Sequence, residues 1–276
     1  MPIPAAYLLD LDGTLYVHGT AVPGAPEALA RLRREGVPFR FVTNTTSRPR
    51  AALGARLRSL GFEAHDHEIS TPVTAAAELL RERGITLAAP FLPEPSLEDL
   101  GGLALAGGVS GRPPGATPGA VLVGDLGERW TYALMQEAFE YLLEGALLVA
   151  LSRDRYWRRG ERLALDAGPF VAGLEYAASR EALVAGKPSA AFFQAAVESL
   201  GLEPAVRNEV VMVGDDIWSD VRGAQEAGCG GWLVRTGKFR EDVLRRSGVV
   251  PDRVIDSAAE LAALATGARE GRDGGR

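Results

Sequence analysis

The feature that most constrains the fold of this chain is a regular alternation of short apolar runs with amphipathic stretches. The first pair is typical: Tyr7-Leu-Leu-Asp10 has the pattern of a buried strand, and residues 25–35 carry Leu29 and Leu32 at helical spacing before Gly36. Repeated alternation of strand and helix predicts a mostly parallel sheet with helices on both faces. We therefore expect the doubly wound class of α/β fold.

A change of composition divides this pattern into two parts. Residues 85–119 are rich in proline and glycine, a second α/β pattern follows them, and the first pattern then returns. We predict a discontinuous core formed by residues 1–82 and 184–270, with an α/β domain of residues 83–183 inserted into it. Residues 271–276 are expected to be a disordered tail, because they contain only Gly, Arg and Asp.

Charge and cysteine content argue against several classes of function. The 36 acidic residues outnumber the 30 basic ones, and a net charge of -6 disfavours a general electrostatic grip on nucleic acid or anionic membrane. The single cysteine and three histidines exclude an intrachain disulfide and a zinc site of clustered cysteines. No apolar run approaches the roughly 20 residues of a membrane span, and the first residues lack a signal-peptide pattern. We expect a cytoplasmic protein without nucleic-acid or membrane partners.

Polar side chains gather at four predicted strand or loop ends, and ligand sites of open α/β sheets lie at the carboxyl ends of strands. The segments are Asp10-Leu-Asp12-Gly-Thr14, Thr43-Asn44, Gly186-Lys187-Pro188 and Gly214-Asp215-Asp216 with Asp220. If these segments converge, Asp10, Asp12 and Asp215 would repel one another strongly unless a cation lay among them. An all-oxygen donor set of this kind suits Mg²⁺, which also binds substrate phosphate.

The same residues suit phosphoryl transfer, in which positioning and charge neutralisation dominate. Lys187 would restrain the nucleophile and hold a phosphoryl oxygen, while Thr43 and Asn44 would supply neutral donors. Asp10 would attack phosphorus and form an aspartyl-phosphate. Asp12 would protonate the leaving oxygen and then accept a proton from the attacking water.

Lysine is rare in this chain: Lys187 and Lys238 are the only lysines among its 30 basic residues. Genomic base composition is the simplest explanation. The alternative is that arginine is not an acceptable substitute where lysine is retained, because a compact ammonium and a planar guanidinium bind differently. We expect Lys238, within the segment Arg235-Thr-Gly-Lys-Phe239, to be structural rather than catalytic.

In their order along the chain, the four segments resemble the four motifs of the haloacid dehalogenase superfamily of phosphohydrolases, over essentially the whole sequence. The long gap between the second and third motifs is similar to the branch with a large α/β cap of the second type. Further segments resemble one subgroup of that branch, that of phospholysine phosphohistidine inorganic pyrophosphate phosphatase and the haloacid dehalogenase-like hydrolase domain-containing proteins. They are 41–46, 166–170, 186–189, 192–193 and 235–239.

The resemblance implies a Rossmann-like core with an inserted cap that closes over the site. It also implies that Asp10 is the nucleophile and a magnesium ligand, and that Asp12 is the acid/base and binds magnesium through its backbone carbonyl. Asp215 would be the third protein ligand. Asp216 and Asp220 would lie beside the metal or serve as alternate ligands; the alternative for both is that they cap the following helix.

In the cap, Arg153, Asp154 and Arg155 follow a predicted strand at residues 146–151, and the resemblance implies that this loop faces the site and sorts substrates. Arginine there suits an anionic leaving group. The alternatives are a solvated charged loop and a contact between two caps, which would make the protein a homodimer.

The expected activity is Mg²⁺-dependent hydrolysis of a phosphate ester, phosphoanhydride or phosphoramide of a small molecule. One alternative is a phosphotransferase or mutase, which would pass the phosphoryl group to a second substrate. Another is a non-catalytic phosphate-binding scaffold, against which Asp12 argues because a binding module needs no acid at that position.

Overall fold

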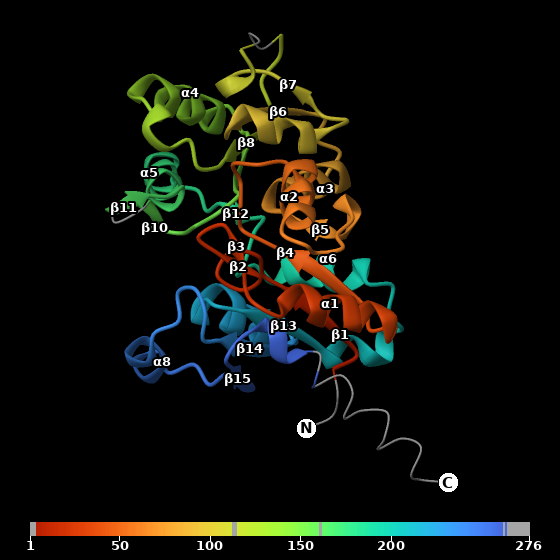
Figure 1. Cartoon of the computed structure of the whole chain (residues 1–276). Coiled ribbons are helices and arrows are strands. Elements are labelled where there is room, and N and C mark those ends of the chain that lie inside the picture. Colours follow the sequence, from red (N-terminus) through yellow and green to blue (C-terminus); the bar gives the residue numbers. More distant parts are fainter. Residues whose placement is uncertain (1–3, 112–114, 160–161, 262, 264–276) are drawn as a thin grey trace. The chain divides into compact units, whose positions relative to one another are not determined.

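The structure of the protein is a computed structural model and describes residues 4–111, 115–159, 162–261 and 263. The described residues form two compact units (Figure 1). The described residues within 1–43, 51–70 and 187–276 build the first unit, and those within 44–50 and 71–186 build the second. Each unit contains a parallel sheet with helices, which confirms the predicted α/β class.

The first unit is organised around a six-stranded parallel sheet in the order β15-β14-β13-β1-β4-β5. Its strands are β1 (Ala6–Leu9), β4 (Phe39–Val42), β5 (Ile69–Ser70), β13 (Val210–Gly214), β14 (Gly230–Val234) and β15 (Arg253–Ile255). Its helices are α1 (Ala25–Arg34), α2 (Arg50–Ser59), α6 (Ala190–Ser199), α7 (Gly223–Glu226) and α8 (Glu241–Ser247). A small antiparallel hairpin pairs β2 (Tyr16–Val17) with β3 (Thr20–Ala21).

The central strands of this sheet are apolar because both of their faces are covered. All four residues of β1 are buried, and Tyr7 and Leu9 lie in one core cluster with Leu29 of α1 and Leu53 of α2. α1 begins with a proline in its first turn and buries one apolar stripe, as its sequence spacing predicts.

The second unit has a five-stranded parallel sheet in the order β12-β9-β8-β6-β7. Its strands are β6 (Leu87–Phe91), β7 (Ala104–Leu105), β8 (Ala120–Val123), β9 (Leu147–Ala150) and β12 (Leu183–Val184). Its helices are α3 (Pro72–Glu82), α4 (Tyr132–Leu143) and α5 (Gly168–Ala178). Val121 and Val123 pack in a core cluster with α4 and α5, whereas Leu122 packs on the other face with Val73 and Leu80 of α3.

α3 marks a difference from the predicted domain boundary. The sequence pattern placed residues 1–82 in the core, yet the contacts of α3 assign it to the second unit. The physical reason is its apolar face, which covers the second sheet. Residues 44–50 also belong to this unit: the Ser96 hydroxyl donates to the carbonyl of Thr46 at 2.7 Å, and the backbone amide of Arg50 donates to Asp99 Oδ2 at 2.8 Å.

Several strands lie within stretches of the sequence that read as loops. β6 lies inside the proline-rich segment 85–119 and includes Pro90, which pairs in register with Leu122 of β8. The missing amide hydrogen of Pro90 is tolerated because β7 ends at Leu105, opposite Ala88, so no partner strand needs a donor there. Strands β10 (Tyr156–Arg159) and β11 (Arg162–Leu165) form an antiparallel hairpin where a charged loop was expected. The predicted disordered tail, residues 271–276, lies outside the described residues.

Candidate active site

Two neighbouring strands end at the same edge of the first sheet, and each is followed at once by an aspartate. β1 and β13 run parallel with Leu9 opposite Val213, so Asp10 and Asp215 leave the sheet side by side. The backbone amide of Asp10 donates to the carbonyl of Val213 at 3.0 Å, which fixes this register up to the site. Strand pairing thus brings together Asp10 and Asp215, which lie 205 residues apart in the sequence.

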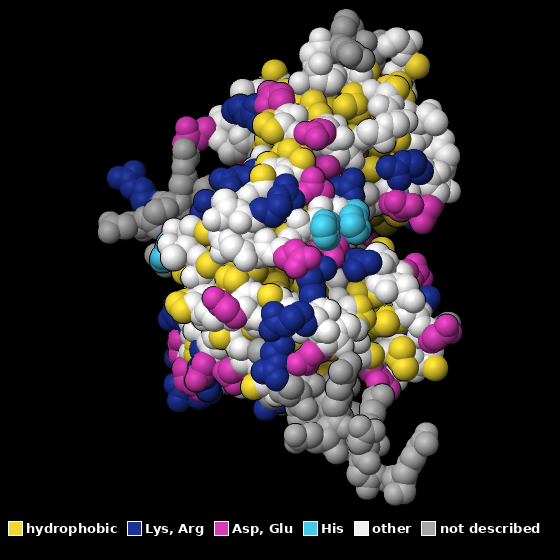
Figure 2. All heavy atoms as spheres, turned by 45° about the vertical axis from the view of Figure 1, so that its right-hand side comes forward, with side chains coloured by type: hydrophobic (Ala, Val, Ile, Leu, Met, Phe, Trp, Pro, Cys, Tyr) yellow, Lys and Arg dark blue, Asp and Glu magenta, His cyan; other side chains and the backbone are white. Residues whose placement is uncertain are grey.

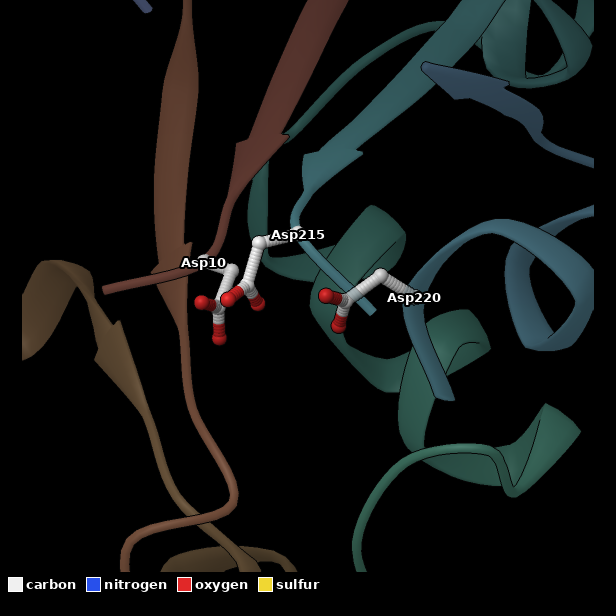
Figure 3. Close-up of side chains that lie close together, drawn as sticks. All are labelled: Asp10, Asp215 and Asp220. Atoms are coloured by element: carbon white, nitrogen blue, oxygen red, sulfur yellow. The ribbon is translucent and has the colours of Figure 1, made fainter. Parts of the chain in front are cut away.

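Three buried carboxylates converge at this edge (Figure 3). Asp10, Asp215 and Asp220 each offer one oxygen, and these oxygens all lie within 4.8 Å of one another. None of the three residues is more than 7% exposed. Asp220 comes from the π-helical turn Ile217–Arg222, which follows the end of β13.

One buried cation faces this acidic group. Lys187 Nζ donates to Asp10 Oδ1 at 2.6 Å, to Asp220 Oδ1 at 2.7 Å and to the carbonyl of Val42 at 3.4 Å. The residue is 2% exposed, so these contacts replace water around the ammonium. Burial lowers the pKa of Lys187, but the charges of Asp10 and Asp220 raise it further, and the net direction is upward.

Three carboxylates and one ammonium leave an excess of negative charge. Burial, Asp10 and Asp220 raise the pKa of Asp215 to about 8. Burial also raises the pKa of Asp220. The charge of Lys187 lowers this pKa, the charge of Asp10 raises it, and the resulting value is about 6. The raised pKa values mean that bound protons relieve the repulsion between these carboxylates. A divalent cation among them would relieve the same repulsion. Because its donors are all carboxylate oxygens, the group fits a hard ion such as Mg²⁺.

Gly13 and Thr14 complete the turn after Asp10. The Thr14 hydroxyl, which is fully buried, donates to Asp10 Oδ2 at 3.3 Å. Gly13 has φ = 93°, and a side chain there would overlap the carboxylate of Asp215. The turn therefore requires glycine both for its backbone conformation and for the close approach of Asp215.

The other predicted site residues of the first two segments lie in different surroundings. Asp12 is exposed, so its side chain does not join the buried carboxylates. Thr43 is buried at the end of β4, directly after Val42, whose carbonyl accepts from Lys187. Asn44 is the first residue of the second unit, where its amide oxygen lies against Gly186.

Asp216 and Asp220, which the sequence treated alike, have different environments. Asp216 Oδ1 accepts from the amides of Trp218 and Ser219 at 2.9 and 3.1 Å, so Asp216 caps the helical turn. Burial raises the pKa of Asp216, but Lys238 and these amides lower it more, and the net direction is downward. Asp220 joins the carboxylate group, and its Oδ2 accepts from the Asp216 amide at 3.1 Å.

The loop after β9 is tied down within the second unit. Arg153 Nη2 pairs with Glu175 Oε2 of α5 at 2.6 Å, and the amide of Asp154 donates to Ser152 Oγ at 3.1 Å. The carbonyl of Arg155 accepts from the amide of Asp166 at 3.2 Å. Arg153 and Glu175 line an open depression of about 320 Å³. Substrate contact by this loop stays a prediction.

A loop of the first unit that the sequence set aside also reaches the site. The amide of Lys238 donates to Asp215 Oδ2 at 2.7 Å, and the Thr236 hydroxyl donates to the carbonyl of Gly13. The signal for this loop was the segment Arg235–Phe239, but its side chains alone do not show that a backbone amide would bind Asp215.

Family models for haloacid dehalogenase-like hydrolases match residues 7–98 and 184–261. The human haloacid dehalogenase-like hydrolase domain-containing protein 2 is 44% identical over 237 residues, which cover 85% of each chain. Human phospholysine phosphohistidine inorganic pyrophosphate phosphatase is 37% identical over 266 residues, covering 93% of this chain and 92% of that protein. The solved p-nitrophenyl phosphatase from Archaeoglobus fulgidus has a TM-score of 0.84 and 27% identity, with 95% and 99% of the two chains covered.

The chain therefore belongs to the haloacid dehalogenase-like hydrolases, and the family resemblance of its motifs is confirmed. It is an enzyme of this hydrolase family, and the relatives above with a named activity are phosphatases.

Surface charge and helix length both bear on nucleic-acid and membrane partners. Basic and acidic side chains are interspersed on the face shown in Figure 2, without a broad field of one sign. Across the described ranges, every helix is too short or too polar to cross a bilayer. The expectations of a cytoplasmic location and of no nucleic-acid or membrane partner stay predictions.

Proposed function

We propose that this protein is a Mg²⁺-dependent phosphatase that hydrolyses a phosphate ester, phosphoanhydride or phosphoramide of a small molecule through an aspartyl-phosphate. The observation that carries this proposal is the buried carboxylate of Asp10, bonded to Lys187 Nζ at 2.6 Å beside two further carboxylates. The bond from the ammonium holds one oxygen of the Asp10 carboxylate in place, and a carboxylate nucleophile must be positioned in this way. The phosphatase names of two relatives support the same conclusion.

In the first step, a carboxylate oxygen of Asp10 bonds to phosphorus while the bond from phosphorus to the leaving oxygen breaks. Asp12 donates its proton to that oxygen, a role that its exposed position two residues beyond Asp10 suits. In the second step, Asp12 accepts a proton from water, the water oxygen bonds to phosphorus, and the aspartyl–phosphorus bond breaks. Inorganic phosphate and the original Asp10 carboxylate result.

The cation would be held by the side chains of Asp10 and Asp215 and by the backbone carbonyl of Asp12, with Asp220 beside them. When bound, Mg²⁺ supplies positive charge against the phosphoryl oxygens. Lys187 would pair with the phosphoryl group as well as with Asp10. Thr43 and Asn44 would donate hydrogen bonds to its remaining oxygens.

We assign catalysis to the first unit and substrate selection to the second, which would act as the cap. Arg153, Asp154 and Arg155 are the proposed specificity residues there, since guanidinium groups suit an anionic leaving group. Arg153 pairs with Glu175 at 2.6 Å, so an anionic leaving group would compete with this carboxylate for the guanidinium.

The test is phosphate release from 4-nitrophenyl phosphate and a panel of phosphorylated metabolites, with Mg²⁺ and with a chelator. Asp10→Asn should abolish turnover while the variant keeps the wild-type fold. Asp256→Asn, at an aspartate whose side chain is 87% exposed, is the matched control and should retain it. Turnover by Asp10→Asn at the wild-type rate would refute the mechanism. Transfer of phosphate to an added alcohol instead of water would identify a phosphotransferase.

A further inference from the structure

The segment Thr236-Gly237-Lys238 follows β14, and its backbone contacts the acidic site at Asp215, whereas Lys187 donates to the other two carboxylates. It belongs to none of the four segments from which the function was proposed. Its three residues make three different contacts with the site. We propose that this segment, called here the 236–238 clamp, is a positioning element that sets the orientation of Asp215 for the cation. The inference rests on the proposed function.

The first contact uses the main chain. The amide of Lys238 donates to Asp215 Oδ2 at 2.7 Å, which engages one carboxylate oxygen and directs the carboxylate plane. A hydrogen bond of this kind holds a metal-binding carboxylate in one orientation. Less side-chain freedom is then lost when the metal binds. Because the donor is a backbone amide, a substitution of the Lys238 side chain leaves this hydrogen bond in place.

The second contact is steric. Gly237 has φ = 60°, and a side chain at this position would overlap both Asp215 Oδ2 and the Cα of Gly13. Glycine is therefore required for the backbone conformation and for the approach of the clamp to Asp215. Gly13 and Gly237 lie against the same carboxylate, so Asp215 is enclosed by two glycine turns from different strands.

The third contact joins those two turns. The Thr236 hydroxyl donates to the carbonyl of Gly13, across 223 residues of sequence. This bond connects the end of β14 to the loop that carries Asp10 and Asp12. Lys238 adds a separate side-chain contact, in which its Nζ pairs with Asp216 Oδ2 at 3.1 Å. That lysine is mostly exposed, so its side-chain pair contributes little to stability.

Changes that displace the backbone of the clamp should weaken cation binding, whereas removal of the Lys238 ammonium should not. Gly237→Ala should displace the Lys238 amide and weaken Mg²⁺ binding by about 10- to 100-fold, the range seen when groups that orient metal ligands are removed. Thr236→Val should weaken it by about tenfold for the same reason, and Thr236→Ser should restore most of the affinity because it keeps the hydroxyl. Lys238→Met keeps the amide and removes a positive charge, so it should not weaken Mg²⁺ binding.

The experiment is calorimetric titration of the full-length, metal-free variants with MgCl₂, with the rise in melting temperature on adding Mg²⁺ as a second readout. Thermal unfolding in chelator checks that each variant folds. The expected order of affinity is wild type and Lys238→Met, then Thr236→Ser, then Thr236→Val and Gly237→Ala. Folded Thr236→Val and Gly237→Ala that bind Mg²⁺ like wild type would overturn the clamp. Wild-type protein that fails to bind Mg²⁺ would instead overturn the proposed function.

Discussion

Replacing Lys187 by Met should cost the metal-free protein a large part of its stability. The substitution keeps the length of the side chain but removes the ammonium that lies 2.6 Å from Asp10 and 2.7 Å from Asp220. Removing one partner of a buried ion pair costs about 3–5 kcal/mol, because the remaining charge is left uncompensated. For a protein of this size, that loss corresponds to a fall in melting temperature of roughly 6–20 °C.

The loss should depend on pH in a definite direction. The carboxylates of Asp215 and Asp220 already have raised pKa values of about 8 and about 6. The Lys187 ammonium lowers the pKa of Asp220, so removing it raises that pKa further. At about pH 5.5 much of the repulsion is relieved by protonation, so the difference between Lys187→Met and wild type should shrink from its value at about pH 8. Thermal and urea unfolding in chelator at the two pH values measures it.

The matched variant is Lys187→Arg, which keeps a positive charge in a larger, planar group. The site encloses a single nitrogen between Asp10, Asp220 and the carbonyl of Val42, so a guanidinium cannot occupy it without displacing one of them. We expect partial recovery of stability and no recovery of phosphatase activity. A Lys187→Met protein within about 1 kcal/mol of wild type at about pH 8 would refute the charge argument. Full activity of Lys187→Arg would show that lysine is rare here for compositional reasons alone.

Two further predictions follow from buried groups of the first unit. The pKa of Asp215 is about 8 in the folded protein and near 3.8 when unperturbed, so the folded state holds a proton that the unfolded state releases between these values. Without metal, this group makes stability fall as the pH rises from about 4 to about 8. The Mg²⁺-induced rise in melting temperature should therefore be larger at about pH 8 than at about pH 6, and an equal rise at both would contradict the assignment. The second concerns Tyr7, whose hydroxyl is fully buried without a hydrogen-bond partner among the described residues, and whose pKa burial raises to about 12 despite Arg253. Tyr7→Phe keeps the edge-on ring contact with Trp232 and removes the unsatisfied hydroxyl, so urea unfolding should show a gain of up to about 1 kcal/mol. A loss of stability would mean that the hydroxyl has a partner.

The elements with strong local patterns were predictable from the sequence. The helix expected at residues 25–35 is α1, Ala25–Arg34, because four buried positions repeat at helical spacing. The strands before Asp10 and Asp215 were predictable because parallel strands covered on both faces are continuous apolar runs. By contrast, β6 was missed because Pro90 argues against a strand, and only its short neighbour β7 makes proline acceptable there.

The sequence by itself determined the class of fold, the acids at the strand ends and the isolated lysine, since these depend on local spacing and on the rule that such sites lie at the carboxyl edge of a sheet. Only the tertiary structure decided which carboxylates lie together and which groups each of them contacts. Asp216 and Asp220 are four residues apart, yet one caps a helical turn and the other bonds to a lysine 33 residues away. The amide of Lys238 reaches Asp215 from the end of another strand. Such assignments depend on distances between elements remote in the chain, which a local pattern does not encode.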